Sequence, residues 1–268
     1  MEEGERWRRF ADSFQNADHC YRVRHVPKLS EIDALPSFQN ESVKCYSCEE
    51  KAFRVYCETN GKAYATVLES SDSCWDIAVR EDLHPWGSEV EHLFVMYGLP
   101  RCLLRRDRLL LHCAYILTEY GAVVFTAPSG TGKTTQAELW RKHRGSRIIN
   151  GDRAILGFDQ GKATVHSFVH SGSSDCCENV SAPLAAIVCL SQAKENRVTQ
   201  LRGMQALRRL LQGTYLLPEF REDMPKLVEL SQRFCQEVPL LHLACLPDGT
   251  AVDALEAAFV ELNIGIQP

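Results

Sequence analysis

One short stretch of this chain combines residue types and spacing that suit the binding of phosphate groups. Residues 127–135 read APSGTGKTT and follow an apolar run over 122–126. Gly130 and Gly132 allow backbone N–H groups to turn toward phosphate oxygens, Lys133 can reach the β- and γ-phosphates, and the Thr134 hydroxyl can bind Mg²⁺. The stretch predicts a phosphate-binding loop whose nucleotide-binding residues are Ser129, Gly130, Thr131, Gly132, Lys133, Thr134 and Thr135.

The motif departs from the full phosphate-loop pattern at one position. The pattern G-x-x-x-x-G-K-[ST] has glycine where this chain has Ala127, the smallest side chain available. The alternative interpretation is a glycine-rich turn that joins a strand to a helix and binds no ligand. Strand, loop, lysine, hydroxyl and helix all fall in the expected order, which favours nucleotide binding.

Phosphoryl transfer also requires an acid that holds the metal and groups that act at the transferred phosphate. Asp152 follows a predicted strand over 147–150, where its carboxylate can bind Mg²⁺; the alternative is a turn aspartate after Gly151. His112 lies 21 residues before Lys133 on the preceding predicted strand and could sit beside the γ-phosphate. The alternative for His112 is an ordinary core histidine, because apolar residues flank it.

Two arginines could stabilise negative charge at the γ-phosphate. Arg153 follows Asp152 directly, and Arg197 follows a predicted central strand over 185–190 through a loop. Each could instead be a surface ion-pair residue. The predicted catalytic residues are therefore His112, Lys133, Asp152 and Arg153, and the predicted Mg²⁺ ligands are Thr134 and Asp152.

The region 109–268 alternates strand and helix patterns, which is typical of an α/β fold. Strands are predicted over 109–116, 122–126, 147–150, 154–158, 185–190 and 240–245. Helices are predicted over 133–143, 203–212, 224–236 and 249–262. The first two strands are joined by a short turn near 119–121, so the predicted sheet is mixed.

Residues 1–108 are predicted to form a smaller β-rich module. Alternating segments over 52–58 and 63–68 flank Asn60-Gly61, which is the strongest short signal for a hairpin turn. A third strand is predicted over 74–79 and a helical face over 89–97. We therefore expect two domains, 1–108 and 109–268, with the first as a candidate for substrate or peptide recognition.

Composition and charge exclude several classes of protein. Hydrophobic content of 45% and charged content of 24% are ordinary for a globular protein, and the net charge of −5 argues against nucleic-acid binding. The acidic N-terminus lacks the apolar segment of a secretory signal, and no apolar run approaches the roughly 18 to 20 residues that cross a bilayer. We expect a cytoplasmic protein with neither nucleic acid nor membrane as a partner.

The twelve cysteines are scattered along the chain. In a protein without a secretory signal, they are expected to be reduced thiols that act as small core residues. Cys45 and Cys48 have the spacing of a zinc-binding pair, but no second C-x-x-C pair accompanies them. Reduced thiols are therefore the favoured interpretation, with zinc binding as the alternative.

Three motifs together resemble a known family. LHCA at 111–114, APSGTGKTT at 127–135 and NGDR at 150–153 are similar to the catalytic domain of HPr kinase/phosphorylase, whose fold is shared with the nucleotide-binding part of ATP-dependent phosphoenolpyruvate carboxykinase. The resemblance covers residues 109–190. The chain looks still closer to the shorter HPr-kinase-like proteins of bacterial peptide-modification gene clusters, some of which phosphorylate a serine of a precursor peptide.

The resemblance implies a phosphoenolpyruvate-carboxykinase-type phosphate-loop domain that uses ATP and Mg²⁺. It implies that Lys133 and the loop amides bind the β- and γ-phosphates, that Thr134 and Asp152 hold Mg²⁺, and that His112 lies near the transferred phosphate. It also implies a peptide or small protein as the phosphate acceptor, and a homo-oligomer as one expectation for assembly.

One position departs from the pattern of that family. HPr kinases carry two successive acids before the arginine, and the first is the proposed base for the acceptor hydroxyl; this chain has Gly151 there. Asp175 and Glu178, in the polar loop over 167–181, are candidate replacements, with plain loop polarity as the alternative. A loose transition state could also need little help from a base.

Three functions are consistent with these patterns. The favoured one is an ATP- and Mg²⁺-dependent kinase that phosphorylates a hydroxyl, expected to be serine or threonine of a peptide or small protein. A second is a nucleotide-binding accessory protein whose N-terminal module binds a peptide by strand addition without transfer chemistry. A carboxykinase-like enzyme for a small carboxylic acid is disfavoured because the chain is short.

Overall fold

The structure is a computed structural model that describes residues 10, 19–30, 32–48, 51–57, 61–71, 73–83, 97–172, 174 and 176–265. The chain forms two compact units. One consists mainly of Leu103–Tyr215 and Asp223–Pro268, and the other of Ser13–Cys102 together with Leu216–Glu222. The last segment therefore belongs to the N-terminal unit although it lies more than a hundred residues further along the chain.

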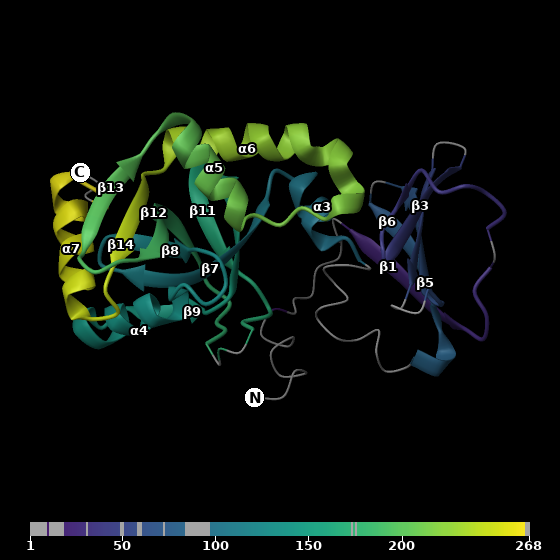
Figure 1. Ribbon diagram of the computed structural model, residues 1–268, viewed down its shortest axis with the longest axis horizontal. Coiled ribbons are helices and arrows are strands. Elements are labelled where there is room, and N and C mark those ends of the chain that lie inside the picture. The colour runs from purple at the N-terminus through teal and green to yellow at the C-terminus, as the bar shows by residue number, and fades with distance from the viewer. Residues whose placement is uncertain are drawn as a thin grey trace. The chain divides into compact units, whose positions relative to one another are not determined.

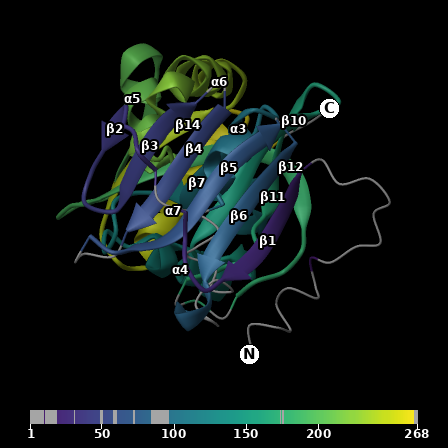
Figure 2. The same cartoon turned by 90° about the vertical axis from the view of Figure 1, so that its right-hand side faces the viewer.

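The N-terminal unit contains a mixed six-stranded sheet in the order β1-β6-β5-β4-β3-β2 (Figure 2). Its strands are β1 (Cys20–Val26), β2 (Phe38–Gln39), β3 (Val43–Cys48), β4 (Lys51–Cys57), β5 (Ala63–Ser71) and β6 (Cys74–Arg80). β1 pairs with β6 in parallel, and the other neighbours pair antiparallel. The short helices near this sheet are η1 (Glu81–Leu83), α3 (Leu99–Leu104) and η3 (Pro218–Asp223).

The alternating sequence of this unit produces a sheet with one face packed on aromatic side chains. Tyr56, Trp75 and Ile77 are fully buried, and Phe220 of η3 joins the same core. The strands predicted over 52–58, 63–68 and 74–79 are confirmed by β4, β5 and β6. The helix predicted over 89–97 and the predicted turn residue Asn60 lie outside the described residues, apart from the last helix position.

The second unit contains a mixed eight-stranded sheet, whose main path runs β11-β10-β7-β8-β12-β14-β13 while β9 pairs with β7. Its strands are β7 (Leu109–Thr118), β8 (Gly121–Thr126), β9 (Arg147–Asn150), β10 (Arg153–Asp159), β11 (Lys162–Ser167), β12 (Ser181–Gln192), β13 (Arg197–Leu201) and β14 (Leu240–Cys245). β8, β12 and β14 are parallel, whereas β7 is antiparallel to β8. The predicted strands and the predicted mixed pairing are confirmed.

Four helices cover this sheet and confirm the helices predicted from the sequence: α4 (Lys133–Arg144), α5 (Gly203–Gly213), α6 (Met224–Glu237) and α7 (Gly249–Glu261). α4 and α7 pack together on one face, and α5 and α6 lie together on the other (Figure 1). The core between the sheet and the first pair includes Phe125, Trp140, Val188 and Phe259. The strand ends that carry the phosphate-loop motif are therefore held by a packed core.

Glycines mark both ends of α4. Gly132 has a φ of 118° and precedes the first helical residue, while Gly145 has a φ of 65° and its N–H bonds to the Arg141 carbonyl. Both values lie in the left-handed region, which glycine adopts without strain. Between these ends, Ala137 and Trp140 are buried against the sheet. The local sequence thus sets where the helix after the loop begins and ends.

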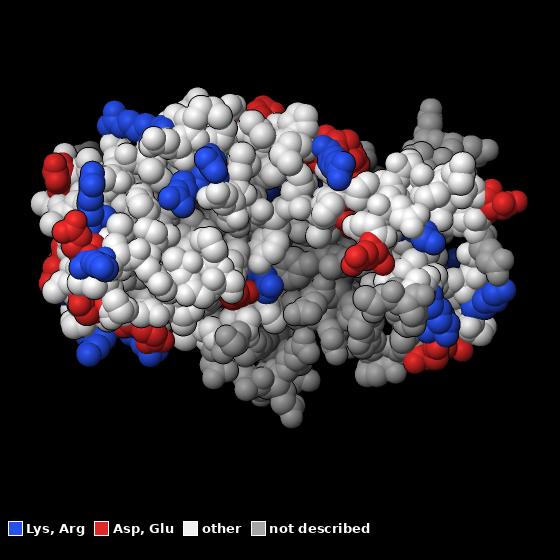
Figure 3. All heavy atoms as spheres, viewed as in Figure 1, with Lys and Arg blue, Asp and Glu red and all other residues white. Residues whose placement is uncertain are grey.

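Ion pairs join α4 to α7 at the surface. Arg144 donates from Nη2 to Asp253 Oδ1 at 2.7 Å and to Glu256 Oε2 at 2.7 Å. Figure 3 shows basic and acidic side chains interspersed over this part of the molecule. Among the helices that the structure describes, none is long and apolar enough to span a membrane.

Candidate functional site

The loop between β8 and α4 has the backbone conformation that the motif predicts. Gly130 and Gly132 have φ values of 75° and 118°, which a residue with a Cβ adopts only with strain. The first turn of α4 follows, and its free N–H groups and positive dipole end favour an anion at this point. Backbone geometry, and not sequence alone, therefore supports phosphate binding here.

Lys133 is folded back over this loop. Its Nζ donates to the Ala127 carbonyl at 3.0 Å and to the Pro128 carbonyl at 3.4 Å, and the residue is 7% exposed. Burial lowers the pKa of Lys133 below its usual value, and the Asp152 carboxylate opposes that shift. The ammonium group is thus held at the loop before any ligand arrives.

Strand pairing brings His112 and Asp152 together although they are 40 residues apart. His112 of β7 faces Arg153 of β10 in the sheet register, and the Cys113 N–H bonds to the Asp152 carbonyl at 3.0 Å. His112 Nδ1 lies 3.0 Å from that carbonyl and 3.4 Å from Asp152 Oδ1. A carbonyl oxygen only accepts hydrogen bonds, so Nδ1 is the donor and the neutral ring carries its lone pair on Nε2.

The neutral form of His112 is favoured by its surroundings. Burial and the nearby Lys133 cation lower the pKa of His112 below its ordinary value, while the Asp152 carboxylate opposes this change. The ring is therefore available as a proton acceptor near neutral pH.

Asn150 orients the turn that presents Asp152, a role that the sequence patterns did not indicate. The side chain is fully buried, and its Oδ1 accepts from the N–H groups of Asp152 and Arg153, both at 3.0 Å. Its Nδ2 donates to the carbonyls of Phe168 at 2.6 Å and His170 at 3.1 Å. The sequence signals for Asn150 were its polar side chain at the end of an apolar strand and its place in the NGDR motif at 150–153.

Arg153 is held by a residue from a distant part of the chain. Its Nε donates to the Tyr215 hydroxyl at 3.2 Å, and its guanidinium carbon lies 5.7 Å from the centre of the Tyr215 ring. Its Nη1 also lies 2.7 Å from Asp152 Oδ2. Tyr215 follows α5 and carried no recognisable motif, so sequence reasoning missed it.

These segments line one cleft of about 310 Å³. Its lining residues are His112, Ser129, Gly130, Gly132, Lys133, Thr134, Thr135, Gly151, Asp152, Ser171 and Ser174. Most of the residues predicted for nucleotide and metal binding thus share a single opening. Thr131 lines a neighbouring cavity instead, and Arg153, which pairs with Asp152, does not line the cleft.

The oxygen ligands in this cleft suit Mg²⁺. The Asp152 carboxylate and the Thr134 hydroxyl both line it, and Mg²⁺ is commonly held by one or two protein oxygens together with substrate phosphates and water. In the part of the chain that the structure describes, no group of three or more His, Cys, Asp or Glu could hold a metal ion by itself. A metal held in this cleft would therefore depend on phosphate oxygens.

Ser174 fills the space beside Gly151. A Cβ built on Gly151 would lie 2.4 Å from both Cβ and Oγ of Ser174, which is closer than packed atoms approach. The fully buried Ser171 donates from Oγ to the Ser174 carbonyl, and Ser174 Oγ accepts from the Cys176 N–H at 3.2 Å. The hydroxymethyl group of a loop residue thus takes the place that a side chain at position 151 would occupy.

Other residues considered from the sequence lie elsewhere. Glu178 forms an ion pair with Arg147 and does not line the cleft. Arg197 lies on β13 at an edge of the sheet and does not line the cleft either. Asp175 lies outside the described residues.

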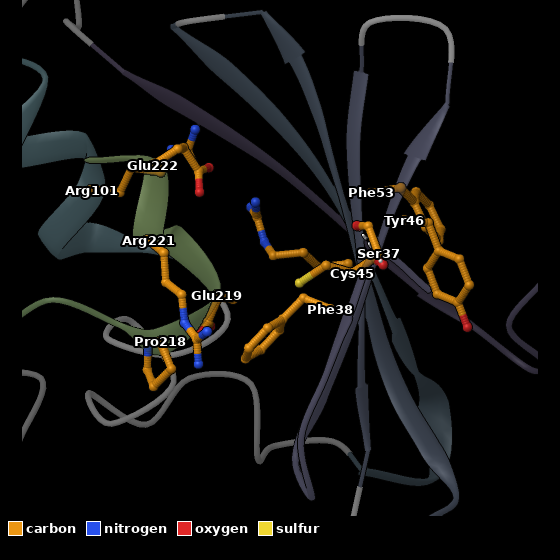
Figure 4. Close-up of a pocket in the computed structure, with 11 residues that line it drawn as sticks. Ser37, Phe38, Cys45, Tyr46, Phe53, Arg101, Pro218, Glu219, Arg221 and Glu222 are labelled. Atoms are coloured by element: carbon orange, nitrogen blue, oxygen red, sulfur yellow. Dashed lines mark hydrogen bonds and ion pairs between the residues drawn. The ribbon is translucent and has the colours of Figure 1, made fainter. Parts of the chain in front are cut away.

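The N-terminal unit holds a second cavity, of about 370 Å³ (Figure 4). Phe38 and Cys45 of the sheet face Pro218 and Glu219 of η3 across it. Arg54, which also lines the cavity, is 2% exposed and forms an ion pair with Glu69. The cavity lies beside β3, and β2 pairs with the outer edge of this strand at Lys44 and Cys45.

The cysteines that the structure describes are all free thiols. Burial raises the pKa of Cys45 to about 11, so this thiol stays protonated near neutral pH. The side chain of Cys48, its suggested partner in a zinc site, lies outside the described residues.

No protein-family model matches the chain, and no curated protein matches it. Among solved structures, the HPr(Ser) kinase/phosphatase from Coxiella burnetii is similar to 57% of this chain and 94% of its own, with a TM-score of 0.33 and 10% sequence identity. A TM-score of this size does not by itself establish a common fold.

Proposed function

We propose that this protein is a kinase that uses ATP and Mg²⁺ to phosphorylate a hydroxyl group, with serine or threonine of a peptide or small protein as the acceptor. The observation that carries the proposal is the convergence of three separate segments on one cleft. These are the glycine-containing loop with Lys133, the turn with Asp152, and His112 of β7. A glycine-rich turn without a ligand would require no such convergence.

The groups that line this cleft support phosphate binding. The N–H groups at the start of α4 and the Lys133 ammonium group are donors suited to phosphate oxygens. Lys133 is already held near the loop by two neutral carbonyls, so little side-chain freedom is lost when it turns to a charged ligand. Mg²⁺, when bound by Asp152 and Thr134, would neutralise charge on the β- and γ-phosphates.

In the proposed reaction, the acceptor oxygen forms a bond to the γ-phosphorus while the bond from that phosphorus to the β–γ bridging oxygen breaks, releasing ADP. The acceptor proton must leave, and Gly151 supplies no carboxylate for it. We assign this role to Nε2 of His112, because its Nδ1 is committed to the Asp152 carbonyl and its neutral form is favoured. A loose transition state makes the demand on this base modest.

The test is transfer of label from γ-labelled ATP to a mixture of serine- and threonine-containing peptides in the presence of Mg²⁺. Lys133→Met should reduce labelling about 100-fold or more, because it removes the positive charge that stabilises the negative charge developing on the transferred phosphoryl group. Lys142→Met is the matched control, since Lys142 is exposed on the same helix and does not line the cleft. ATP binding with no label in peptide, protein or released phosphate would refute the kinase.

The second candidate is an accessory protein that binds nucleotide and peptide without transfer. The cavity beside β3 favours peptide binding, because no described strand pairs with the outer edge of β3 beyond Cys45 and an extended peptide can add to a free strand edge. The Ser37 N–H bonds to the Cys45 carbonyl, so the backbone groups of Cys45 point to this edge. Alternate residues of a strand point their backbone groups the same way, so those of Ser47 point to this edge too. Ser47→Pro should weaken peptide binding and leave ATP binding unchanged if strand addition occurs.

A further inference from the structure

A second opening adjoins the phosphate cleft in the same unit. This cavity of about 340 Å³ shares Gly130, Gly132 and Thr135 with the cleft, so the two are joined through the first turn of α4. If the loop binds the phosphates of a nucleoside triphosphate, the nucleoside points either into this cavity or into solvent. The cavity is therefore the candidate site for the nucleoside.

The far wall of the cavity is built by strand ends. Gln192 ends β12 and Ala193 follows it, while Leu246 and Pro247 follow β14. These two strands run parallel to each other and to β8, which leads into the phosphate loop. Ligands of open α/β sheets bind in the crevice outside the carboxyl ends of such strands. The apolar side chains at this wall can pack against a flat ring.

Gln136 places a buried polar side chain in the wall of this cavity. The residue lines the cavity and is 2% exposed, and its Nε2 donates to Cys245 Sγ at 3.3 Å. Its Oε1 is buried and has no hydrogen-bond partner among the described residues. An unpaired buried acceptor is costly to a folded protein, and such groups are rare unless a ligand or water uses them.

We infer that this cavity holds the base of the bound nucleotide, and that the Gln136 carboxamide turns from the wall toward the base and selects adenine, its Oε1 accepting a hydrogen bond from the 6-amino group. Guanine and hypoxanthine carry an oxygen at that position, which would place two acceptors against each other. The inference rests on the proposed function, because it assigns the base of the same nucleotide. It adds a residue that determines specificity and lies outside the phosphate-loop motif pattern.

The experiment compares the affinity of the full-length protein for ATP, inosine triphosphate and inorganic triphosphate, each with Mg²⁺. Inosine triphosphate differs from ATP in the group at position 6 and in the proton that its N1 carries, and inorganic triphosphate reports the phosphate cleft alone. We expect ATP to bind about tenfold more tightly than inosine triphosphate, the factor expected for one hydrogen bond of ordinary strength. Equal affinities for the two nucleotides would overturn the inference.

Variants of glutamine provide the second arm. Gln136→Met keeps a similar shape and removes the acceptor, so it should abolish the preference for ATP while leaving the affinity for inorganic triphosphate unchanged. It should also raise the unfolding midpoint without ligand, because it removes an unpaired buried oxygen. Gln212→Met is the matched control, since Gln212 is exposed on α5 and does not line this cavity.

The outcomes separate the two proposals. If none of the three ligands binds, the phosphate site and the proposed function fail. If inorganic triphosphate binds as tightly as both nucleotides, the phosphate site stands and the base cavity is refuted. A preference for ATP that survives Gln136→Met would assign base selection to another residue and overturn the role of Gln136. The comparison on the unmodified protein tests the inference even if the variant fails to fold.

Discussion

Replacement of Asn150 is expected to be among the most damaging single changes near the cleft. Its buried amide makes four hydrogen bonds, two accepted from the N–H groups of Asp152 and Arg153 and two donated to the carbonyls of Phe168 and His170. A hydrogen bond contributes about 0.5–1.5 kcal/mol net, and an unpaired buried partner costs about 1–3 kcal/mol. Asn150→Ala should therefore lower the free energy of unfolding by about 3–5 kcal/mol, at the upper end of single substitutions.

Asn150→Asp separates hydrogen bonding from volume. The carboxylate can still accept from the two N–H groups, but its second oxygen then faces two carbonyl oxygens and repels them when ionised. The pKa of the introduced carboxyl is consequently raised in the folded protein above its unfolded value of about 3.9. Its ionisation is favoured in the unfolded chain, so the destabilisation relative to wild type grows as pH rises from about 4 through the folded pKa.

Urea unfolding of wild type and variant at pH 5 and pH 8 measures this effect, because the difference between the two proteins removes the contribution of all other groups. Asn263→Asp is the control: Asn263 is exposed and has a φ of 53°, a conformation that asparagine and aspartate both tolerate. If Asn150→Asp is equally destabilising at both pH values, the amide does not donate to the two carbonyls and the account of this turn is wrong.

Three further changes test other parts of the unit. Gly151→Ala should lower the free energy of unfolding by about 1–3 kcal/mol, because the added Cβ would overlap Ser174. In a double-mutant cycle measured by thermal unfolding, Ser174→Gly should restore most of this loss, and no rescue would contradict the contact. Burial and the nearby Arg209 cation lower the pKa of His242, so Arg209→Gln should raise this pKa in an NMR titration. As pH falls below about 6.5, the ordinary pKa of histidine, protonation of His242 destabilises the fold, and it should do so less in the variant than in wild type. Asp248→Ala removes the oxygen that accepts the N–H of the second residue of α7 and should cost about 0.5–2 kcal/mol in urea unfolding; an unchanged midpoint would rule out this cap.

Local patterns predicted the elements of the second unit well because they depend on short-range geometry. The apolar run over 122–126 and the glycines at 130 and 132 indicated a strand, a loop with positive φ angles and a helix start, and all three are present. Periodicity likewise indicated α5 and α6 to within a residue at their ends. These features need only the chain within a few residues of each position.

Contacts between distant segments were harder to predict. Tyr215 reaches Arg153 because the chain after α5 pairs with β7, where the Tyr215 N–H bonds to the Leu110 carbonyl. Glu178 was a reasonable candidate for the cleft, yet its loop directs it to Arg147. Both outcomes depend on how whole strands and loops pack, and a short sequence motif does not encode this packing.

By itself, the sequence determined the loop with positive φ angles before α4 and the strand and helix positions around it, because glycine conformations and side-chain periodicity act locally. Only the tertiary structure decided which side chains share a cleft. The register of β7 against β10 sets His112 beside Asp152, and the packing of the polar loop sets Ser174 into the space beside Gly151. Strand register and loop packing arise from the burial of the whole core, so residues far apart in the chain must fold together before the cleft exists.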